Sequence, residues 1–302
     1  MEYLKQDLKR LFDITDLGEP NKLVGIEFTR DRERGTLTIR QTKYIESILE
    51  KYGMQDANPV STPLDPNVKL EPREKSAEPQ SHGSNYASLT GSLMYAAIGT
   101  RPDIAYAVNK LCSFNSNPDL AHWAAAKRVL RYLKGTKELG ITYTKNRDHE
   151  FYGYADASFA GNSDLTSTSG STFILNGGAI TWTSKKEATP ALSTAEAEFT
   201  SMARAGKEII WLRNLYTEIG YEPKNATILY GDNKSAIAIA TNAQFHKRSK
   251  YFDLQNLYIR KKIKIGWITL VYCSTDEMTA DILTKALQRG KHVQHSKGLG
   301  LR

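Results

Sequence analysis

Four acidic residues in the second half of the chain have the type and surroundings that divalent-metal chemistry requires. They are Asp156 in YGYADASF, Glu198 in STAEAEF, Asp232 in ILYGDNKSA and Asp281 in TADILTK. Each lies at the end of a predicted strand or within a predicted helix, next to an apolar run. Two carboxylates about 4 Å apart repel by roughly 4 kcal/mol at an effective dielectric constant near 20. A site that gathers four of them therefore needs cations or protons, and hard oxygen ligands favour Mg²⁺ or Mn²⁺.

The elements that would bring these carboxylates together begin at residue 151. Strands are expected over residues 151–161, 170–177, 179–185, 226–232 and 267–273, and helices over about 193–220, 233–241, 254–263 and 277–287. The turn at Asn176-Gly177-Gly178 is a strong hairpin signal, and Ser193 is a candidate cap for the first long helix. This order predicts an α/β fold with one mixed five-stranded sheet and flanking helices: three antiparallel strands come first, and parallel strands follow the helix. Functional groups in such sheets gather at strand ends.

The first half has a mostly helical pattern. Helices are expected over residues 1–12, 42–54, 86–99, 101–114 and 121–136, and strands over 23–31 and 35–41. Residues 71–86 contain almost no apolar side chain and are the best candidate for a mobile linker. The last of these helices carries a basic face that suits a nucleic-acid backbone and plain solvent equally well: Lys127, Arg128, Arg131 and Lys134. We place a domain boundary at residues 145–150, which gives domains of 1–145 and 146–302.

The net charge of +8 is unevenly distributed, at about +2 for residues 1–150 and about +6 for residues 151–302. The densest basic stretch includes Lys247, Arg248, Lys250, Arg260, Lys261 and Lys262. A basic surface beside an acidic pocket suits a phosphodiester substrate. Taken alone, however, the stretch is better explained as a solvated helix face.

Composition also excludes several classes of protein. The two cysteines, Cys112 and Cys273, are far apart and lack a partner motif, which argues against a disulfide framework and a zinc site. No apolar run approaches the roughly 18 residues that a membrane span needs, so no membrane partner is expected. The charged N-terminus lacks a signal-peptide core, which favours the cytoplasm, with the nucleus or a virus-like particle as alternatives.

Several ordered motifs carry a family resemblance that covers essentially the whole chain. The second half contains YADASFAG, STSGSTFILNGGAITWTSKKE, ALSTAEAEF, KEIIWLR, YGDNKSAIAIA and ADILTKAL. These closely resemble the ribonuclease H domain of copia-type (Ty1/copia, Pseudoviridae) retrotransposon Pol polyproteins. The first half contains LFDITDLGEPNKLVGIEF, RQTKYIESILEKYGM, YASLTGSLMYAAIGTRPDIAYAV and AAKRVLRYLKGT. It resembles the C-terminal part of that family's reverse transcriptase and its connection.

The resemblance implies a ribonuclease H-like sheet and assigns the four metal-binding acids to Asp156, Glu198, Asp232 and Asp281. Glu196 competes with Glu198, but the two point about 200° apart on a helix, so only one can face the site. We favour Glu198 because it lies beside the sheet-facing Phe199. Each acid could instead be a surface carboxylate, and Asp232 could cap the helix that follows it.

This chain departs from the family pattern in two ways. Copia-type elements usually carry a His two residues before Asp253, where this chain has Tyr251, and the loop CSTDEMTAD lacks the His that cellular ribonucleases H use. The role of His246 is open. The family's polymerase turn, Tyr-x-Asp-Asp, does not occur, so DNA synthesis by this chain alone is not expected.

The resemblance implies a Mg²⁺- or Mn²⁺-dependent ribonuclease H that uses two ions to cleave the RNA strand of an RNA–DNA hybrid. The basic stretch would contact phosphates, and the upstream polymerase half of Pol is a candidate partner. One alternative is a truncated, non-catalytic nucleic-acid-binding remnant. Another is a transposase or integrase of the same broad fold, which the acid on the first long helix disfavours.

Overall fold

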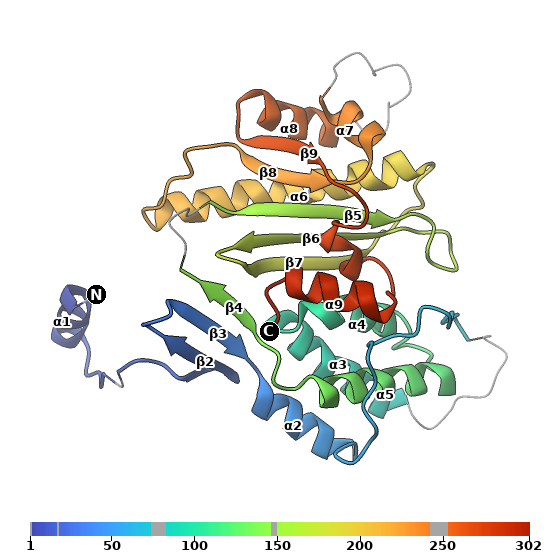
Figure 1. Cartoon of the computed structure of the whole chain (residues 1–302), viewed down its shortest axis with the longest axis horizontal. Coiled ribbons are helices and arrows are strands. Elements are labelled where there is room, and N and C mark those ends of the chain that lie inside the picture. The colour runs from blue at the N-terminus through green and yellow to red at the C-terminus, as the bar shows by residue number, and fades with distance from the viewer. Residues whose placement is uncertain (1, 17, 74–82, 146–149, 242–252) are drawn as a thin grey trace.

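The protein is described by a computed structural model that covers residues 2–16, 18–73, 83–145, 150–241 and 253–302 (Figure 1). The predicted linker therefore lies partly outside the described residues, as does most of the predicted boundary at 145–150. Within these ranges, no helix is both long and apolar enough to cross a bilayer.

The second half is built on a five-stranded sheet with the order β7-β6-β5-β8-β9. Its strands are β5 (Tyr152–Ser158), β6 (Thr168–Leu175), β7 (Gly178–Lys186), β8 (Thr227–Gly231) and β9 (Ile268–Tyr272). The first three strands pair antiparallel, whereas β5 with β8 and β8 with β9 pair parallel. The expected ribonuclease H-like mixed sheet is therefore confirmed.

One face of this sheet is covered by three helices. They are α6 (Thr194–Glu218), α7 (Lys234–Thr241) and α8 (Asp253–Lys264). The core between these layers includes Phe173 and Leu229 from strands, Phe199 and Met202 from α6, and Ile259 from α8. Figure 1 shows the long α6 running behind the strands, so its N-terminal turn comes close to the end of β5 that carries Asp156.

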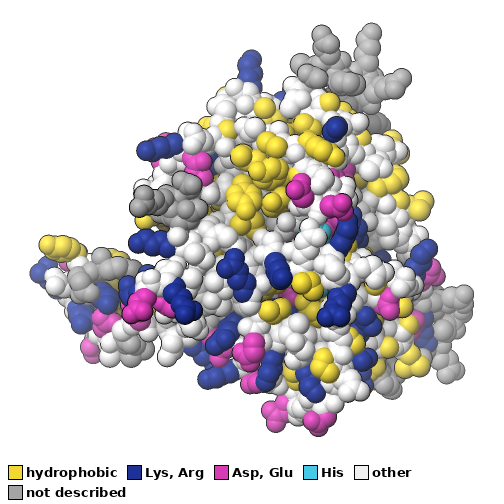
Figure 2. Space-filling model, viewed as in Figure 1, with side chains coloured by type: hydrophobic (Ala, Val, Ile, Leu, Met, Phe, Trp, Pro, Cys, Tyr) yellow, Lys and Arg dark blue, Asp and Glu magenta, His cyan; other side chains and the backbone are white. Residues whose placement is uncertain are grey.

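The opposite face is only partly covered. A short 3₁₀ helix, η3 (Thr279–Leu283), packs on β5 and β6, and α9 (Arg289–Gly298) follows it. Over β5, β8 and β9 hydrophobic side chains come to the surface (Figure 2). The half-buried rings of Tyr154 on β5 and Tyr230 on β8 stack, with their centres 5.1 Å apart.

The prediction of a single closing helix over residues 277–287 is wrong, because the chain forms η3 and then a separate helix, α9. Sequence periodicity misses α9 because its buried side chains are His292, His295 and Ser296 rather than an apolar stripe. Asp281 consequently lies on a short 3₁₀ helix.

The first half combines a small sheet with a helical core. Its elements are α1 (Glu2–Leu11), β1 (Lys22–Leu23), β2 (Ile26–Asp31), β3 (Thr36–Arg40), α2 (Thr42–Lys51), α3 (Gly83–Gly99), η1 (Pro102–Ile104), α4 (Ala105–Cys112), α5 (Leu120–Gly135) and β4 (Ile141–Thr144). The core includes Ile45, Leu89, Leu93, Val108 and Leu130, all fully or almost fully buried. The sequence pattern does not predict β4, because this strand is only four residues long and is completed by pairing with the distant β3.

The basic face of α5 is partly used inside the protein. Arg128 donates to the Thr62 hydroxyl at 3.0 Å, and Arg131 donates to the Asn58 carbonyl at 2.7 Å. These contacts fasten the 58–62 segment to α5, so two of the four expected basic groups have a structural role.

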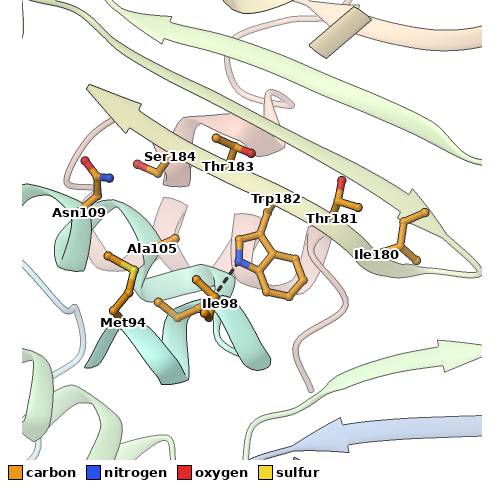
Figure 3. A pocket seen from close by; sticks show the side chains of 10 residues that line it. Met94, Ile98, Ala105, Asn109, Ile180, Thr181, Trp182, Thr183 and Ser184 are labelled. Atoms are coloured by element: carbon orange, nitrogen blue, oxygen red, sulfur yellow. Dashed lines mark hydrogen bonds between the residues drawn. The ribbon is translucent and has the colours of Figure 1, made fainter. Parts of the chain in front are cut away.

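The two halves pack against each other along β7 and α9. The indole N–H of Trp182 on β7 donates to the Ala97 carbonyl on α3 at 2.9 Å, beside a cavity of about 340 Å³ that also borders Met94 and Ile98 (Figure 3). At the C-terminus, Leu301 forms a β-bridge with Ile141 on β4. The last residues of the second half therefore return to the first half.

A buried polar network links α9 to the first half. The Arg101 guanidinium binds both carboxylate oxygens of Asp103, at 2.9 and 2.7 Å, and Tyr132 donates to Asp103 at 2.6 Å. Nε2 of His292 on α9 lies 3.1 Å from the Tyr132 hydroxyl. Burial would raise the pKa of Asp103, but the Arg101 guanidinium outweighs it and holds that pKa below its usual range. Asp103 thus stays ionised in the interior.

Replacing Asp103 with Ala should lower the free energy of unfolding by about 3–5 kcal/mol, because it leaves the buried Arg101 charge without a counter-ion. Chemical denaturation of the full chain measures this loss. The control is Glu138→Ala, which removes an exposed partner of Arg40 and should cost less than about 1 kcal/mol. Equal losses in the two variants would show that the buried pair contributes nothing special to stability.

Candidate metal centre

Asp156 lies near the end of the central strand β5, and its side chain is only 2% exposed. The Thr284 hydroxyl, at the end of η3, donates a hydrogen bond to its carboxylate. Burial raises the pKa of Asp156 to about 7, and the nearby Asp281 contributes to this rise. A carboxylate with such a raised pKa is stabilised in its charged form by an added cation.

Glu198 and Glu196 take different roles on α6. Ser193 caps the helix by accepting from the Glu196 amide at 3.2 Å, and the Glu196 carboxylate accepts from the Leu192 amide at 2.8 Å. Glu196 therefore stabilises the helix start, as in a capping arrangement. Glu198 is buried and faces Asp156, which leaves it as the acid of the pair that reaches the site.

Asp232 follows β8, and its Oδ2 accepts from the Thr275 hydroxyl at 2.8 Å. The cap of the following helix is the neighbouring Asn233, whose Oδ1 accepts from the Ala236 amide at 3.0 Å. The capping role considered for Asp232 is thus performed by Asn233, and the Asp232 carboxylate is left to face the site.

Asp156, Glu198 and Asp232 converge, with one oxygen from each lying within 4.8 Å of the others. At that distance each ionised pair would repel by about 3 kcal/mol at an effective dielectric constant near 20. Oε2 of Glu198 is buried and has no hydrogen-bond partner among the described residues. Burial, followed by repulsion from Asp156 and Asp232, raises the pKa of Glu198 to about 10. The cluster therefore holds protons unless a cation neutralises it.

Asp281 lies beside this cluster rather than among its three closest members. Its Oδ1 is 2.9 Å from the ammonium of Lys285, four residues later. Burial raises the pKa of Asp281, against the opposing effect of Lys285. The structure thus brings all four predicted acids to one region. Three of them have oxygens within 4.8 Å of one another, and the fourth, Asp281, is paired with Lys285.

Sequence reasoning missed three neighbours of the cluster: Thr275, Thr284 and Lys285. The spacing of Lys285 from Asp281 resembles a helical i,i+4 pair and could have suggested the contact. The two threonines carry no such signal, because their partners are distant in the sequence. Thr275 is 43 residues from Asp232, and Thr284 is 128 residues from Asp156.

The basic stretch is only partly visible. Lys247, Arg248, Lys250, Tyr251 and His246 lie outside the described residues. On α8, Arg260 donates to the Ile239 carbonyl at 3.2 Å through Nε, and the Lys262 ammonium lies 4.2 Å from the Trp267 ring centre. Lys261 is exposed. Arg260 and Lys262 thus make internal contacts, and α8 packs on α6, on the side of the sheet away from η3.

Comparison with known proteins identifies the family of the chain. Residues 1–66 match the family described as Reverse transcriptase (RNA-dependent DNA polymerase). The retrovirus-related Pol polyprotein from transposon TNT 1-94 of Nicotiana tabacum is 40% identical over 293 residues, which is 95% of this chain. The putative transposon Ty5-1 protein YCL074W of Saccharomyces cerevisiae is 31% identical over 212 residues, covering 68% of this chain and 67% of that protein. The chain belongs to the copia-type retrotransposon Pol family.

The chain spans about a fifth of the tobacco polyprotein, 22% of its length. Among solved structures, LC11-RNase H1 isolated from compost aligns with a TM-score of 0.37 at 13% identity, covering 45% of this chain and 94% of that chain. Homology to Pol, together with the mixed sheet described above, supports a ribonuclease H domain in the second half.

The donor set suits a hard divalent cation. The three converging ligands offer only carboxylate oxygens, which are the ligands that Mg²⁺ and Mn²⁺ prefer. The unpartnered Oε2 of Glu198 supplies an acceptor without a protein donor. Thr284 and Thr275 orient two of the carboxylates from outside the cluster, which is the usual arrangement around metal ligands.

Metal binding should release protons near neutral pH, because the raised pKa of Asp156, about 7, keeps that group partly protonated in the metal-free protein. Affinity for Mn²⁺ should therefore increase as the pH rises from 6 to 8. Titration calorimetry in two buffers of different ionisation enthalpy measures the number of protons released. As a control, Glu222→Gln removes an exposed carboxylate and should leave the number of released protons unchanged. A binding heat that is independent of the buffer would contradict the expected protonation.

Proposed function

We propose that this Pol segment is a ribonuclease H that uses a divalent metal to cleave the RNA strand of an RNA–DNA hybrid. The observation that carries the proposal is the convergence of Asp156, Glu198 and Asp232, from three different elements, within 4.8 Å. Carboxylates are costly to bury together, and catalysis is a common reason for such an arrangement. Membership of the Pol family makes nucleic acid the natural substrate class.

Each side chain has a definable task in this mechanism. Asp156, Glu198 and Asp232 would hold Mg²⁺ or Mn²⁺, and Asp281 would complete the ligand set for a second ion. Bound metal supplies Lewis-acid stabilisation of the phosphate and lowers the pKa of water. Thr284 holds the Asp156 carboxylate in position, and Thr275 does the same for Asp232.

Lys285 has the further task of balancing charge. Burial would lower the pKa of its ammonium, but Asp156 and Asp281 outweigh that effect and raise it, so Lys285 stays charged. One positive charge beside four acids reduces their repulsion without removing it. Specificity for the RNA strand would come from contacts to ribose 2′-hydroxyl groups, which distinguish RNA from DNA.

Asp156→Asn should reduce Mg²⁺-dependent hybrid cleavage to background while hybrid binding persists, because the amide cannot replace an anionic ligand. Thr284→Val, which removes only the supporting hydrogen bond, should cost about 10- to 100-fold in rate. A labelled RNA–DNA hybrid, incubated with the full chain and Mg²⁺ or with EDTA, gives both rates.

The matched control is Glu218→Gln, an exposed carboxylate in the last turn of the same helix as Glu198, which should cleave like the wild type. Cleavage that survives Asp156→Asn would show that the site is misassigned. A wild-type chain that binds hybrid but cuts neither strand would instead identify a non-catalytic remnant. Single-stranded RNA, RNA duplex and DNA duplex of the same sequence test the hybrid preference.

A further inference from the structure

A polar cavity of about 360 Å³ opens between the two halves, next to the acidic cluster. The first half contributes the segment 64–71 together with Tyr106 and Lys110. The nuclease half contributes Ser158, residues 160–163 and Lys285. Both domains of the Pol segment are thus needed to form its walls.

Lys110, on α4 of the first half, is a cation at this cavity whose contacts are uncharged: the Asn162 amide and, 5.9 Å from the ammonium, the centre of the Phe114 ring. Its side chain is half-buried, and its ammonium donates to Oδ1 of Asn162 at 2.8 Å. Among the described residues, no carboxylate lies within 4.0 Å of it, and the nearby Asp164 is already paired with Lys186 at 2.7 Å. Burial lowers the pKa of Lys110, and Lys186 lowers it further. A half-buried ammonium held by a neutral amide is expected to attract an anion.

The other charged groups that line the cavity are two lysines and two acids. Lys285 is paired with Asp281, and Lys69 adds a second positive charge at an exposed position. Of the two acids, Asp65 accepts from the Asn67 amide at 3.0 Å within its own turn, and Glu71 is exposed. The part of the wall nearest the acidic cluster therefore presents ammonium, hydroxyl and amide groups.

The cavity lies close to the acidic cluster. Ser158 is two residues beyond Asp156 on the same strand, which corresponds to about 7 Å, and Lys285 borders both sites. A nucleic-acid strand carries one negative charge per about 3.4 Å of helix axis. A strand that presents one phosphate to the acidic cluster and continues in the direction of Ser158 therefore has another phosphate within reach of the cavity.

We propose that Lys110 binds a backbone phosphate of the nucleic-acid substrate, so that the first half of the chain forms part of the substrate-binding surface of the nuclease half. This inference rests on the proposed function for the identity of its ligand. It adds a contact from outside the nuclease domain, and it gives the close packing of the two halves a role in substrate binding.

The test measures binding of a labelled RNA–DNA hybrid to the full chain at several salt concentrations, in an Asp156→Asn background that does not cut the probe. Removing one phosphate contact should reduce the magnitude of the slope of log K against log[salt] by about 0.9. Lys110→Met should show this reduction, since it keeps the apolar stem and removes the charge. Lys110→Arg should retain the slope.

Lys207→Met is the matched control, because Lys207 is an exposed lysine on α6, on the other side of the sheet from η3. The salt slope of this variant should equal that of the Asp156→Asn background. Thermal unfolding of each variant reports whether the fold is kept. Lys110→Gln, which also removes the charge, replaces Lys110→Met if that variant is unstable. An unchanged slope for Lys110→Met overturns the phosphate site, as does an equal loss in Lys207→Met. Failure of wild-type cleavage with a Lys110-dependent slope would overturn the proposed activity and leave the phosphate site standing.

Discussion

Repulsion between buried carboxylates is the constraint around which the second half is organised. Asp156 and Glu198 are almost fully buried and lie with Asp232 in a cluster of acidic oxygens. Such a cluster is unfavourable in a low-dielectric interior unless positive charge or protons compensate it. Lys285 supplies part of that compensation, and the raised pKa values of Asp156 and Glu198 indicate that the remainder must come from protons or a cation. The strand order, the start of α6 and the position of η3 all serve to hold these groups together against their repulsion.

The C-terminal segment connects this cluster to the first half. Thr284 and Lys285 contact the acids, His292 reaches the Tyr132 hydroxyl, and Leu301 bridges Ile141. One stretch of chain therefore contacts the acidic cluster at its start and the first half at its end. Because packed elements of this kind resist small shifts, the position of η3 depends on both halves. A domain boundary near residue 145 separates two different sequence patterns, but many contacts join the residues on its two sides.

Local sequence signals were sufficient for the parts of the structure with a clear period. The hairpin at Asn176-Gly177-Gly178, the Ser193 cap and the strands of the main sheet were all predictable, because turn chemistry and alternation are encoded within a few residues. The four acids were named from their motifs. The β4 strand and α9 were not predictable: β4 depends on a distant partner strand, and α9 buries His292 and His295 instead of an apolar stripe. The contact of Lys110 with Asn162 spans 52 residues and has no local signal at all.

The burial of His292 against Tyr132 also has a consequence for the order in which the chain folds during synthesis. The Arg101–Asp103 ion pair forms within the first half, yet one side of its surroundings is supplied by α9, 160 residues beyond Tyr132. A nascent chain emerges from the ribosome N-terminus first, so this network stays open until α9 has been translated. Contacts that are so distant in sequence also slow folding, because a long loop must close before they form. The polar network in the first half is therefore completed only after the second half has been made.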